Sequence, residues 1–361
     1  MSLSPLQQEL AISAVKVLVL FNVLLGLFSL MTYVERRLLA FMQFRLGPNR
    51  TGPFGILQPV ADGIKLFFKE EVIPEGANRW LFVAAPAMSV VTAFLAIAVV
   101  PYGGTIHIGG RPILLQISDL DVGVLFLFAI SSLGVYGIVT AGWAANNKYT
   151  LIGGLRSSAQ MFSYELALGL SWVTLIMIAG SFRIHDIVDS QAGLLIHWNA
   201  LRQLPAFAVF LVAATAEVNR TPFDLPEAET ELVAGFHTEY SSMRFALMQM
   251  AEYVNMITAS AVGANLFLGG WHFGIPGVPS SPLWFVGKML AFLFLFIWLR
   301  GTVPRFRYDQ LMHFGWKVLV PIAMFWIFVT AAGVALGWGL PLKLAALIVF
   351  MVLTALVVRP R

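Results

Sequence analysis

The stretch Ala11–Tyr33, AISAVKVLVLFNVLLGLFSLMTY, decides the structural class of this chain, because Lys16 is its only charged residue. A transmembrane helix needs about 20 mostly apolar residues, within a range of about 17 to 25. The stretch has that length, which is too long for the apolar core of a signal peptide, and no small-residue cleavage site follows it. We therefore predict that residues 11–33 span a membrane.

The composition extends this prediction to the whole chain. Of its 361 residues, 58% are hydrophobic and 12% are charged, whereas a soluble protein carries about 25% charged residues. We predict an all-α, polytopic integral membrane protein with about nine transmembrane helices in a single membrane domain. The predicted spans are residues 11–33, 81–100, 122–142, 159–180, 203–219, 245–268, 283–299, 318–337 and 342–358.

Basic residues set the predicted orientation, because loops on the cytoplasmic side of a membrane are enriched in Lys and Arg. With the N-terminus outside, 17 of the 23 basic residues lie in inner segments, four in outer segments and two within spans. Since this charge is spread over loops, it does not indicate a nucleic-acid partner. The net charge of +4 is explained by topology instead.

Several cofactor classes are excluded by what the sequence lacks. There is no cysteine, so this chain forms no disulfide and is not expected to hold an iron–sulfur cluster. The six histidines are scattered without the spacing of a metal site. No glycine-rich nucleotide motif is present, so we expect no NAD or flavin bound to this chain.

The inner segment between the first two spans contains a predicted amphipathic helix at residues 56–69. Apolar residues recur there with helical periodicity, and charged residues occupy the opposite face. Such a helix lies at a membrane interface or against another subunit. The apolar positions are Ile56, Leu57, Val60, Ile64, Phe67 and Phe68, and the charged ones are Asp62, Lys65 and Lys69.

An acidic inner loop, residues 219–243, follows the fifth predicted span. Clustered acids usually mean a solvated run, but apolar residues interleave with these, and Pro222 and Pro226 fix the backbone on either side of Asp224. We therefore expect a docked loop, with Arg220 and Arg244 available to partner some of the acids. The other acids in or just beyond this loop are Glu227, Glu229, Glu231 and Glu239.

Four acids lie in or at the ends of predicted spans: Glu35, Glu165, Glu217 and Glu252. Ionisable groups at membrane depth are costly and mark functional sites by default. Burial and like charges raise a carboxyl pKa towards neutrality, so such groups can exchange protons. The alternatives are an interfacial anchor for Glu35 and a polar helix–helix contact for Glu252.

These residues lie in motifs that resemble those of the H-type membrane subunit of proton-pumping NADH:quinone oxidoreductase, respiratory complex I. The resemblance covers roughly residues 10 to 337 and leaves the predicted span 342–358 as an addition. The acidic motif AEVNRTPFDLPEAETE at 216–231 is the most specific. The other motifs are ERRLLA at 35–40, RLGPNR at 45–50, GPFGILQPVADGIK at 52–65, GWAANNKY at 142–149, SYE at 163–165, GFHTEY at 235–240 and AEY at 251–253.

The resemblance implies a role for each group of residues. The protein would form the chamber that admits ubiquinone or menaquinone to the last iron–sulfur cluster, held by the peripheral quinone-reducing subunits. It would also contact the small and antiporter-like membrane subunits and lipids in a bacterial inner membrane. The implied chamber residues are Glu35, Arg36, Arg45, Asp62, Phe223 and Asp224. The implied proton-coupling residues are Glu165, Glu217, Glu227, Glu229, Glu231, Glu239 and Glu252, with Arg220 and Arg244 as charge partners.

The resemblance thus implies a subunit of a proton-translocating enzyme that itself carries no redox centre. The nearest alternative is the equivalent anchor subunit of a membrane-bound hydrogenase or a related dehydrogenase. A secondary transporter would show internal repeats and interrupted helices, which we do not find in the sequence. A structural scaffold, in which the acids only satisfy one another, would tolerate neutral substitutions broadly.

Overall fold

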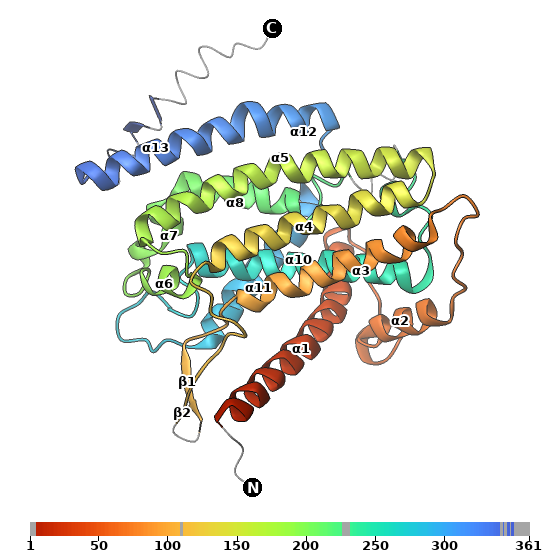
Figure 1. Cartoon of the computed structure of the whole chain (residues 1–361), viewed down its shortest axis with the longest axis horizontal. Helices are drawn as coiled ribbons and strands as arrows, with labels where there is room; N and C mark the ends of the chain where they lie inside the picture. The colour runs from red at the N-terminus through yellow and green to blue at the C-terminus, as the bar shows by residue number, and fades with distance from the viewer. Residues whose placement is uncertain are drawn as a thin grey trace.

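A computed structural model describes residues 5–108, 111–225 and 232–339, together with residues 342, 345–346 and 348–349. The described residues form a helical bundle with one small hairpin (Figure 1), which confirms the all-α prediction. The long helices are α1 (Pro5–Met42), α3 (Arg79–Ala96), α4 (Gly123–Ala144), α5 (Lys148–Ala179), α8 (Leu204–Glu217), α10 (Ser242–Phe267), α11 (Pro282–Thr302) and α13 (Val320–Leu336).

Shorter elements connect these helices. A π-helix, Gly315–Leu319, joins α12 to α13, so that residues 308–336 run as one continuous helix. The short α-helices are α2 (Gln58–Phe68), α6 (Ile184–Asp189), α7 (Asn199–Arg202) and α12 (Tyr308–Phe314). The 3-10 turns are Pro53–Gly55, Ile97–Val99, Leu195–His197 and Gly235–His237.

Six helices of the described chain are long and apolar enough to cross a membrane, and α8 is a shorter apolar helix. Together with α10, they place a helix at each of the first eight predicted spans. The ninth, 342–358, lies largely outside the described residues. The number of crossings and their orientation stay predictions.

Two helices extend well beyond the predicted spans. The first continues to Met42, so Glu35 lies within α1 rather than at its end. The other, α5, begins at Lys148, where the Asn147 side chain caps it by accepting a hydrogen bond from the Tyr149 backbone N–H. Its 32 residues make a helix about 48 Å long, compared with about 30 Å for the hydrocarbon core of a bilayer. The end of α5 near Lys148 is therefore expected to leave the membrane.

The antiparallel hairpin of β1 (Thr105–Ile108) and β2 (Arg111–Leu114) was not predicted. Thr105 pairs with Leu114 and Ile108 with Arg111. Four-residue strands are too short for alternation to be distinguished from a loop. The hairpin marks one end of the bundle, hereafter the hairpin end, and α2 lies towards the other end (Figure 1).

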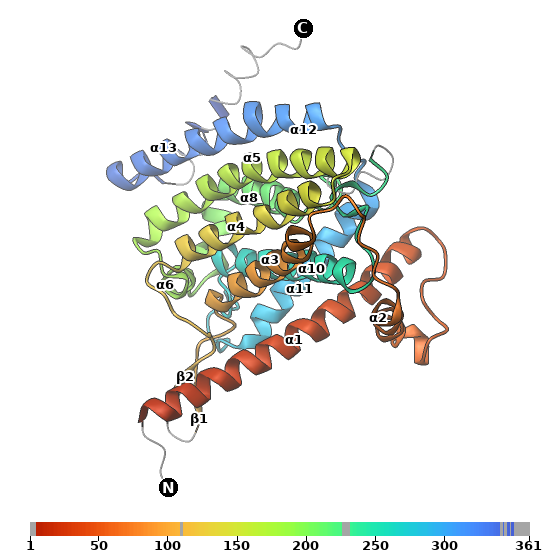
Figure 2. The ribbon, with the colours of Figure 1, turned by 45° about the vertical axis from the view of Figure 1, so that its right-hand side comes forward.

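The helices pack in layers, with α13 beside α5, then α4 and α8, then α3, α10 and α11 (Figures 1 and 2). Glycine permits the closest approach between α4 and α5. A Cβ atom on Gly142 would lie 2.6 Å from the Thr150 backbone oxygen and 3.1 Å from the Gly154 Cα. Small residues of this kind let membrane helices approach closely, where packing rather than hydrophobicity drives association.

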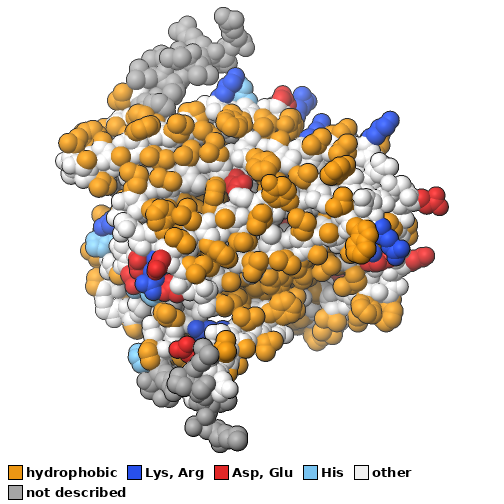
Figure 3. All heavy atoms as spheres, viewed as in Figure 1, with side chains coloured by type: hydrophobic (Ala, Val, Ile, Leu, Met, Phe, Trp, Pro, Cys, Tyr) orange, Lys and Arg blue, Asp and Glu red, His pale blue; other side chains and the backbone are white. Residues whose placement is uncertain are grey.

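The outer surface suits a lipid environment. Apolar side chains cover the face seen in Figure 3, and few charged side chains interrupt its middle. The helix predicted at 56–69 is confirmed as α2, and none of its residues is buried. Four of its apolar side chains are exposed, from 55% for Ile64 to 81% for Phe68. This face is therefore available to a membrane interface or to another subunit.

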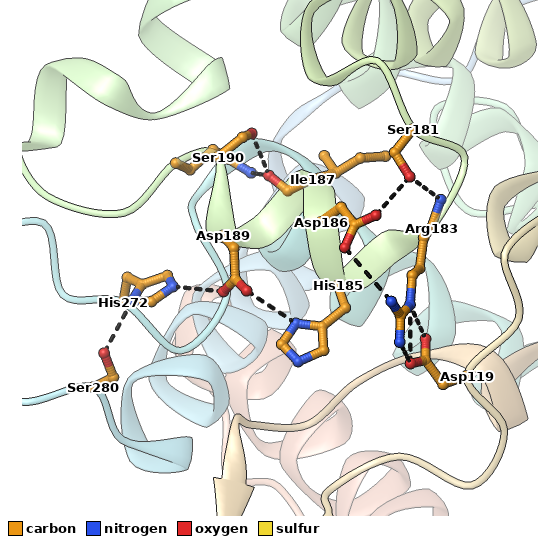
Figure 4. A network of polar contacts seen from close by, with 11 residues as sticks. Asp119, Ser181, Arg183, His185, Asp186, Ile187, Asp189, Ser190, His272 and Ser280 are labelled. Atoms are coloured by element: carbon orange, nitrogen blue, oxygen red, sulfur yellow. Dashed lines mark hydrogen bonds and ion pairs between the residues drawn. The ribbon is translucent and has the colours of Figure 1, made fainter.

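A network of hydrogen bonds and ion pairs connects the loops at the hairpin end (Figure 4). Arg183 Nε donates to both oxygens of Asp119, at 2.9 and 3.0 Å. Asp189 lies between two imidazoles, 3.4 Å from His185 Nδ1 and 3.3 Å from His272 Nε2. The network therefore ties α6 to the loop before α4 and to the segment after α10.

Replacing Asp119 by Asn should weaken this fastening in a pH-dependent way. The hydrogen bond from Arg183 and its charge lower the pKa of Asp119, although burial opposes this shift. The stabilisation is therefore present above the unfolded pKa of about 3.9 and is lost as pH falls through the lower folded pKa. Arg183 is 38% exposed, so we expect a loss of only about 0.5–1 kcal/mol at pH 7.

Thermal unfolding in detergent at pH 7 and pH 3 would measure this effect. The wild-type advantage should be present at pH 7 and shrink at pH 3, whereas Asp309→Asn, at an exposed site, should differ little from wild type at either pH. An advantage that persists unchanged at pH 3 would show that the ionised Asp119–Arg183 pair is not its source.

Candidate functional site

Glu35 is buried within the helix bundle, where its side chain is paired with two arginines. It lies on α1 and is 3% exposed. Arg220 Nη1 donates to Glu35 Oε1 at 2.9 Å, and Arg300, at the end of α11, donates to the same oxygen. The Tyr253 side chain is hydrogen-bonded to Glu35 as well. Glu35 is therefore not an interfacial anchor but a charge enclosed by donors.

Arg220 connects Glu35 to a second acid, Glu252 on α10. Its Nε lies 2.8 Å from Glu252 Oε1, and its guanidinium lies over the Tyr253 ring, 4.4 Å from the centroid. Burial disfavours the charged guanidinium, but Glu252 and Glu35 together raise the pKa of Arg220 above its usual range. We call Glu35, Arg220, Glu252 and Arg300 the charge cluster, and its formal charges sum to zero.

The backbone after α8 places Arg220 in this position. The helix ends at Glu217, and Asn219 follows with a left-handed φ of 55°, a conformation that Asn adopts more readily than most residues. The Phe223 N–H donates to the Arg220 carbonyl at 2.9 Å. The chain thus turns back on itself, and Arg220 reaches α1 and α10 from this turn.

A cavity of about 100 Å³ lies next to Glu252, between α3, α4, α5, α8 and α10, and its largely apolar wall carries a group of polar side chains. A water molecule needs about 10–15 Å³ of such space and two to four polar partners, so the cavity can hold several. Its polar lining residues are Ser89, Thr92, Ser131, Glu217, Asn219, His237, Gln249, Glu252, Asn255 and Thr258.

Two further predicted acids lie on the far side of this cavity. Glu217 lines it and is hydrogen-bonded to Ser131 on α4. Glu165, buried on α5, accepts a hydrogen bond from Ser132 on α4 and is close enough for its charge to act on Glu217. Glu252 and Glu217 therefore line one hydratable space, and Glu165 lies next to it.

Asp224 and Phe223 lie at the other end of the same turn. Arg305 Nη2 donates to Asp224 Oδ2 at 2.9 Å, and Asp224 is buried. The Phe223 ring packs against Tyr164, at 5.3 Å between centroids, and stacks on Phe306, at 5.6 Å. Asp224 thus packs against the segment that follows α11, in agreement with the prediction that this loop is docked rather than solvated.

The remaining predicted chamber residues lie around α2. Arg36 Nη1 lies 2.5 Å from Asp62 Oδ2 across the α1–α2 gap, and Gln58 donates to the other oxygen of Asp62. Arg45 is exposed and donates to Gln43 at 2.7 Å, so it is not brought to Asp62 or Glu35 through a direct bond. The six predicted chamber residues therefore form separate groups rather than one contact network.

The acids of the loop 219–243 are only partly described. Glu239 accepts a hydrogen bond from Asn147 Nδ2 at 2.6 Å. Arg244 pairs at 3.1 Å with Glu71, an acid outside the predicted set, and lies over the Phe82 ring. The predicted coupling residues Glu227, Glu229 and Glu231 lie outside the described residues.

Comparisons with known proteins agree with the motifs. A family model described as NADH dehydrogenase matches residues 15–331. An H-type NADH-quinone oxidoreductase subunit of Geobacter metallireducens is 51% identical over 94% of this chain and 100% of its own length. This chain belongs to the family of H-type NADH-quinone oxidoreductase subunits.

Other members of this H-type family are equally similar. One from Geobacter sulfurreducens is 52% identical over 92% of this chain and 97% of its own length. One from Thermomicrobium roseum is 51% identical over 92% of this chain and 98% of its own length. The resemblance drawn from the motifs is therefore confirmed at the level of the family.

Several residues of the site were missed from the sequence. Arg300 and Arg305 were assigned to topological charge, yet they partner Glu35 and Asp224. One indication of this pairing was present in the sequence: both arginines and the acidic loop were predicted to lie on the inner side of the membrane. Ser131 and Ser132 gave no signal, because a hydroxyl in a membrane helix is ordinary, and Asn147 was identified only as part of the motif at 142–149.

Proposed function

We propose that this chain is the membrane subunit of a proton-translocating NADH:quinone oxidoreductase that admits quinone and couples its reduction to proton movement. The relatives are named as H-type subunits of NADH-quinone oxidoreductase, and the chain covers nearly their whole length. Electrons would come from the partner subunits, which would hold the last iron–sulfur cluster. Quinone would be a substrate here rather than a resident cofactor.

The observation that carries the proposal is the position of Arg220 between Glu35 and Glu252. One guanidinium contacts both Glu35 on α1, the helix next to α2, and Glu252, which lines the cavity. In low-dielectric surroundings a change in charge at one of these groups acts strongly on the others. A charge formed on one side can therefore change the protonation of an acid on the other side.

The mechanism follows from this arrangement. Negative charge formed during quinone reduction near Asp224 and Arg305 would draw the guanidinium of Arg220 towards it. Glu252 would then lose part of its countercharge and take a proton from water in the cavity. When the quinone is protonated and leaves, Arg220 would return and Glu252 would release its proton towards Glu217 and Glu165.

This proposal also sets the location. The protein would lie in the bacterial inner membrane as a multi-pass subunit, with its N-terminus outside and the loop 219–243 on the cytoplasmic side. That side would meet the peripheral quinone-reducing subunits. The small and antiporter-like membrane subunits would lie beside it in the bilayer.

Replacing Glu252 by Gln in the assembled enzyme tests the proposal. The amide keeps the shape of the side chain but cannot exchange a proton, while Glu35 still neutralises Arg220. We expect proton translocation to fall by about fivefold, equivalent to about 1 kcal/mol, and quinone reduction to fall with it. Measurement of both rates in membrane vesicles, with the exposed Glu75→Gln as control, decides the matter. Unchanged rates for both would remove Glu252 from the mechanism.

A further inference from the structure

Gln160 is a fully buried amide of α5 that the mechanism above does not use. It is 0% exposed. Its Nε2 donates to the Ala216 carbonyl at 2.7 Å and to the Phe223 carbonyl at 2.7 Å, and lies 3.4 Å from Asn219 Oδ1. A primary amide has two N–H donors, so both are used on two backbone carbonyls seven residues apart.

The two carbonyls lie at the two ends of the turn that holds the site together. Ala216 immediately precedes Glu217, which lines the cavity, and Phe223 immediately precedes Asp224, which pairs with Arg305. Arg220 lies between them and reaches Glu35 and Glu252. One side chain on a long, well-packed helix thus fixes both ends of the segment that joins the two halves of the site.

Each of three backbone hydrogen bonds of the turn joins residues close in sequence or holds only one end of the turn. The Asn219 N–H donates to the Ala216 carbonyl, and the Phe223 N–H donates to the Arg220 carbonyl. The Pro222 carbonyl accepts from the Phe306 N–H at 3.2 Å, which anchors the far end to the segment after α11. None of these three bonds spans the turn, whereas Gln160 Nε2 joins the Ala216 and Phe223 carbonyls through a common atom.

We propose that Gln160 is a positioning residue that sets how closely Arg220 engages its two acids, by holding the turn 216–223 at a fixed width. This inference deepens the proposed function and rests on it for its effect on coupling. Without the amide, the turn can widen, and Arg220 can no longer contact Glu35 and Glu252 at the same time. Gln160 itself touches neither quinone nor a transferred proton.

Two substitutions distinguish the effect of the hydrogen-bond donors of Gln160 from the effect of its side-chain volume. Gln160→Met keeps the length of the side chain but has no donor. Gln160→Glu has no donor when ionised and one O–H donor when protonated, and burial favours the protonated form. The matched control is Gln116, another buried glutamine with one bond from Nε2 to the Val99 carbonyl, located in the loop before α4 and away from the turn.

In the assembled enzyme, we expect Gln160→Met to lower the ratio of protons translocated to NADH oxidised by about threefold at every pH between about 6 and 8. For Gln160→Glu the deficit should be largest at pH 8 and shrink towards pH 6, as the carboxyl regains a donor. Gln116→Met and Gln116→Glu should stay close to wild type and show no such trend. A deficit of equal size for both Gln160 variants at every pH would overturn the donor role, as would wild-type ratios for both.

Hydrogen exchange separates this inference from the proposed function. Backbone amides of residues 216–223 should exchange at least about tenfold faster in Gln160→Met than in Gln116→Met, since opening of the turn no longer breaks two side-chain bonds. This result would hold even if Glu252→Gln left both enzyme rates unchanged, in which case the proposed function alone would fail. Equal exchange in the two variants would overturn the positioning role.

Discussion

Replacing Arg220 by Met is expected to produce the largest loss of any single change in this chain. Glu252 would lose the cationic partner seen at 2.8 Å, and Glu35 would keep only Arg300. Removing one partner of a buried ion pair costs about 3–5 kcal/mol, because the remaining charge is left uncompensated. We expect a lower melting temperature of the purified protein and a fall in quinone reduction of at least about tenfold in the assembled enzyme.

A second substitution tests the cause. Adding Glu252→Gln to Arg220→Met removes the orphaned carboxylate, so the double variant should melt at a higher temperature than Arg220→Met alone, with no recovery of quinone reduction. Arg79→Met, which removes an exposed arginine, should match wild type in both measurements. If the double variant is no more stable than the single one, the uncompensated charge of Glu252 is not the source of the loss.

Replacing Gly153 by Ala is expected to disturb the site through the backbone. A Cβ atom there would lie 2.8 Å from both the Gly235 carbonyl carbon and the Phe236 nitrogen, and neither can rotate away. The turn Gly235–His237 would have to move off α5, and His237 lines the cavity. Overpacking of this kind costs about 1–3 kcal/mol. We expect a lower melting temperature together with a several-fold loss of proton translocation.

Gly287 on α11 supplies the matched control. A Cβ atom at Gly287 would meet nothing within 4 Å, and alanine favours a helix over glycine by about 1 kcal/mol. Gly287→Ala should therefore be as stable as wild type or more so, with normal translocation. Normal stability of Gly153→Ala would mean that α5 and the 235–237 turn can separate without cost, contrary to the packing described.

The helices were predictable because their cause is local. Runs of about 20 apolar residues in a chain with 12% charge have few other stable arrangements. The helices differ from the predicted spans where they leave the apolar runs: α1 continues past Glu35 to Met42, and α5 starts at Lys148. Both extensions carry charged residues, Glu35 to Arg37 in the first and Lys148 and Arg156 in the second. Hydropathy therefore marks the spanning part of a helix and not its ends.

The acids of the site could be predicted from the sequence, but most of their partners could not. Acids at membrane depth are costly enough to stand out in a sequence, and this argument selected Glu35, Glu165, Glu217 and Glu252. Arg220 was predicted as a charge partner, but Arg300 and Arg305 were not, because pairing depends on which helices pack together. Arg305 meets Asp224 across 81 residues, and no periodicity or motif links the two. Gln160 was missed for the same reason, since its role exists only once α5 lies against the turn.

The charge cluster also constrains how the chain can be assembled during synthesis. Glu35 enters the membrane with the first helix, but its partners follow 185 and 265 residues later in the chain. Until Arg220 has emerged from the ribosome, that carboxyl is expected to stay protonated or to remain at the water-facing surface, since an unpaired charge in hydrocarbon is unfavourable. The final placement of the first helix is therefore a late event, and in truncated chains that end before Arg220 this helix should bind the rest of the bundle more weakly.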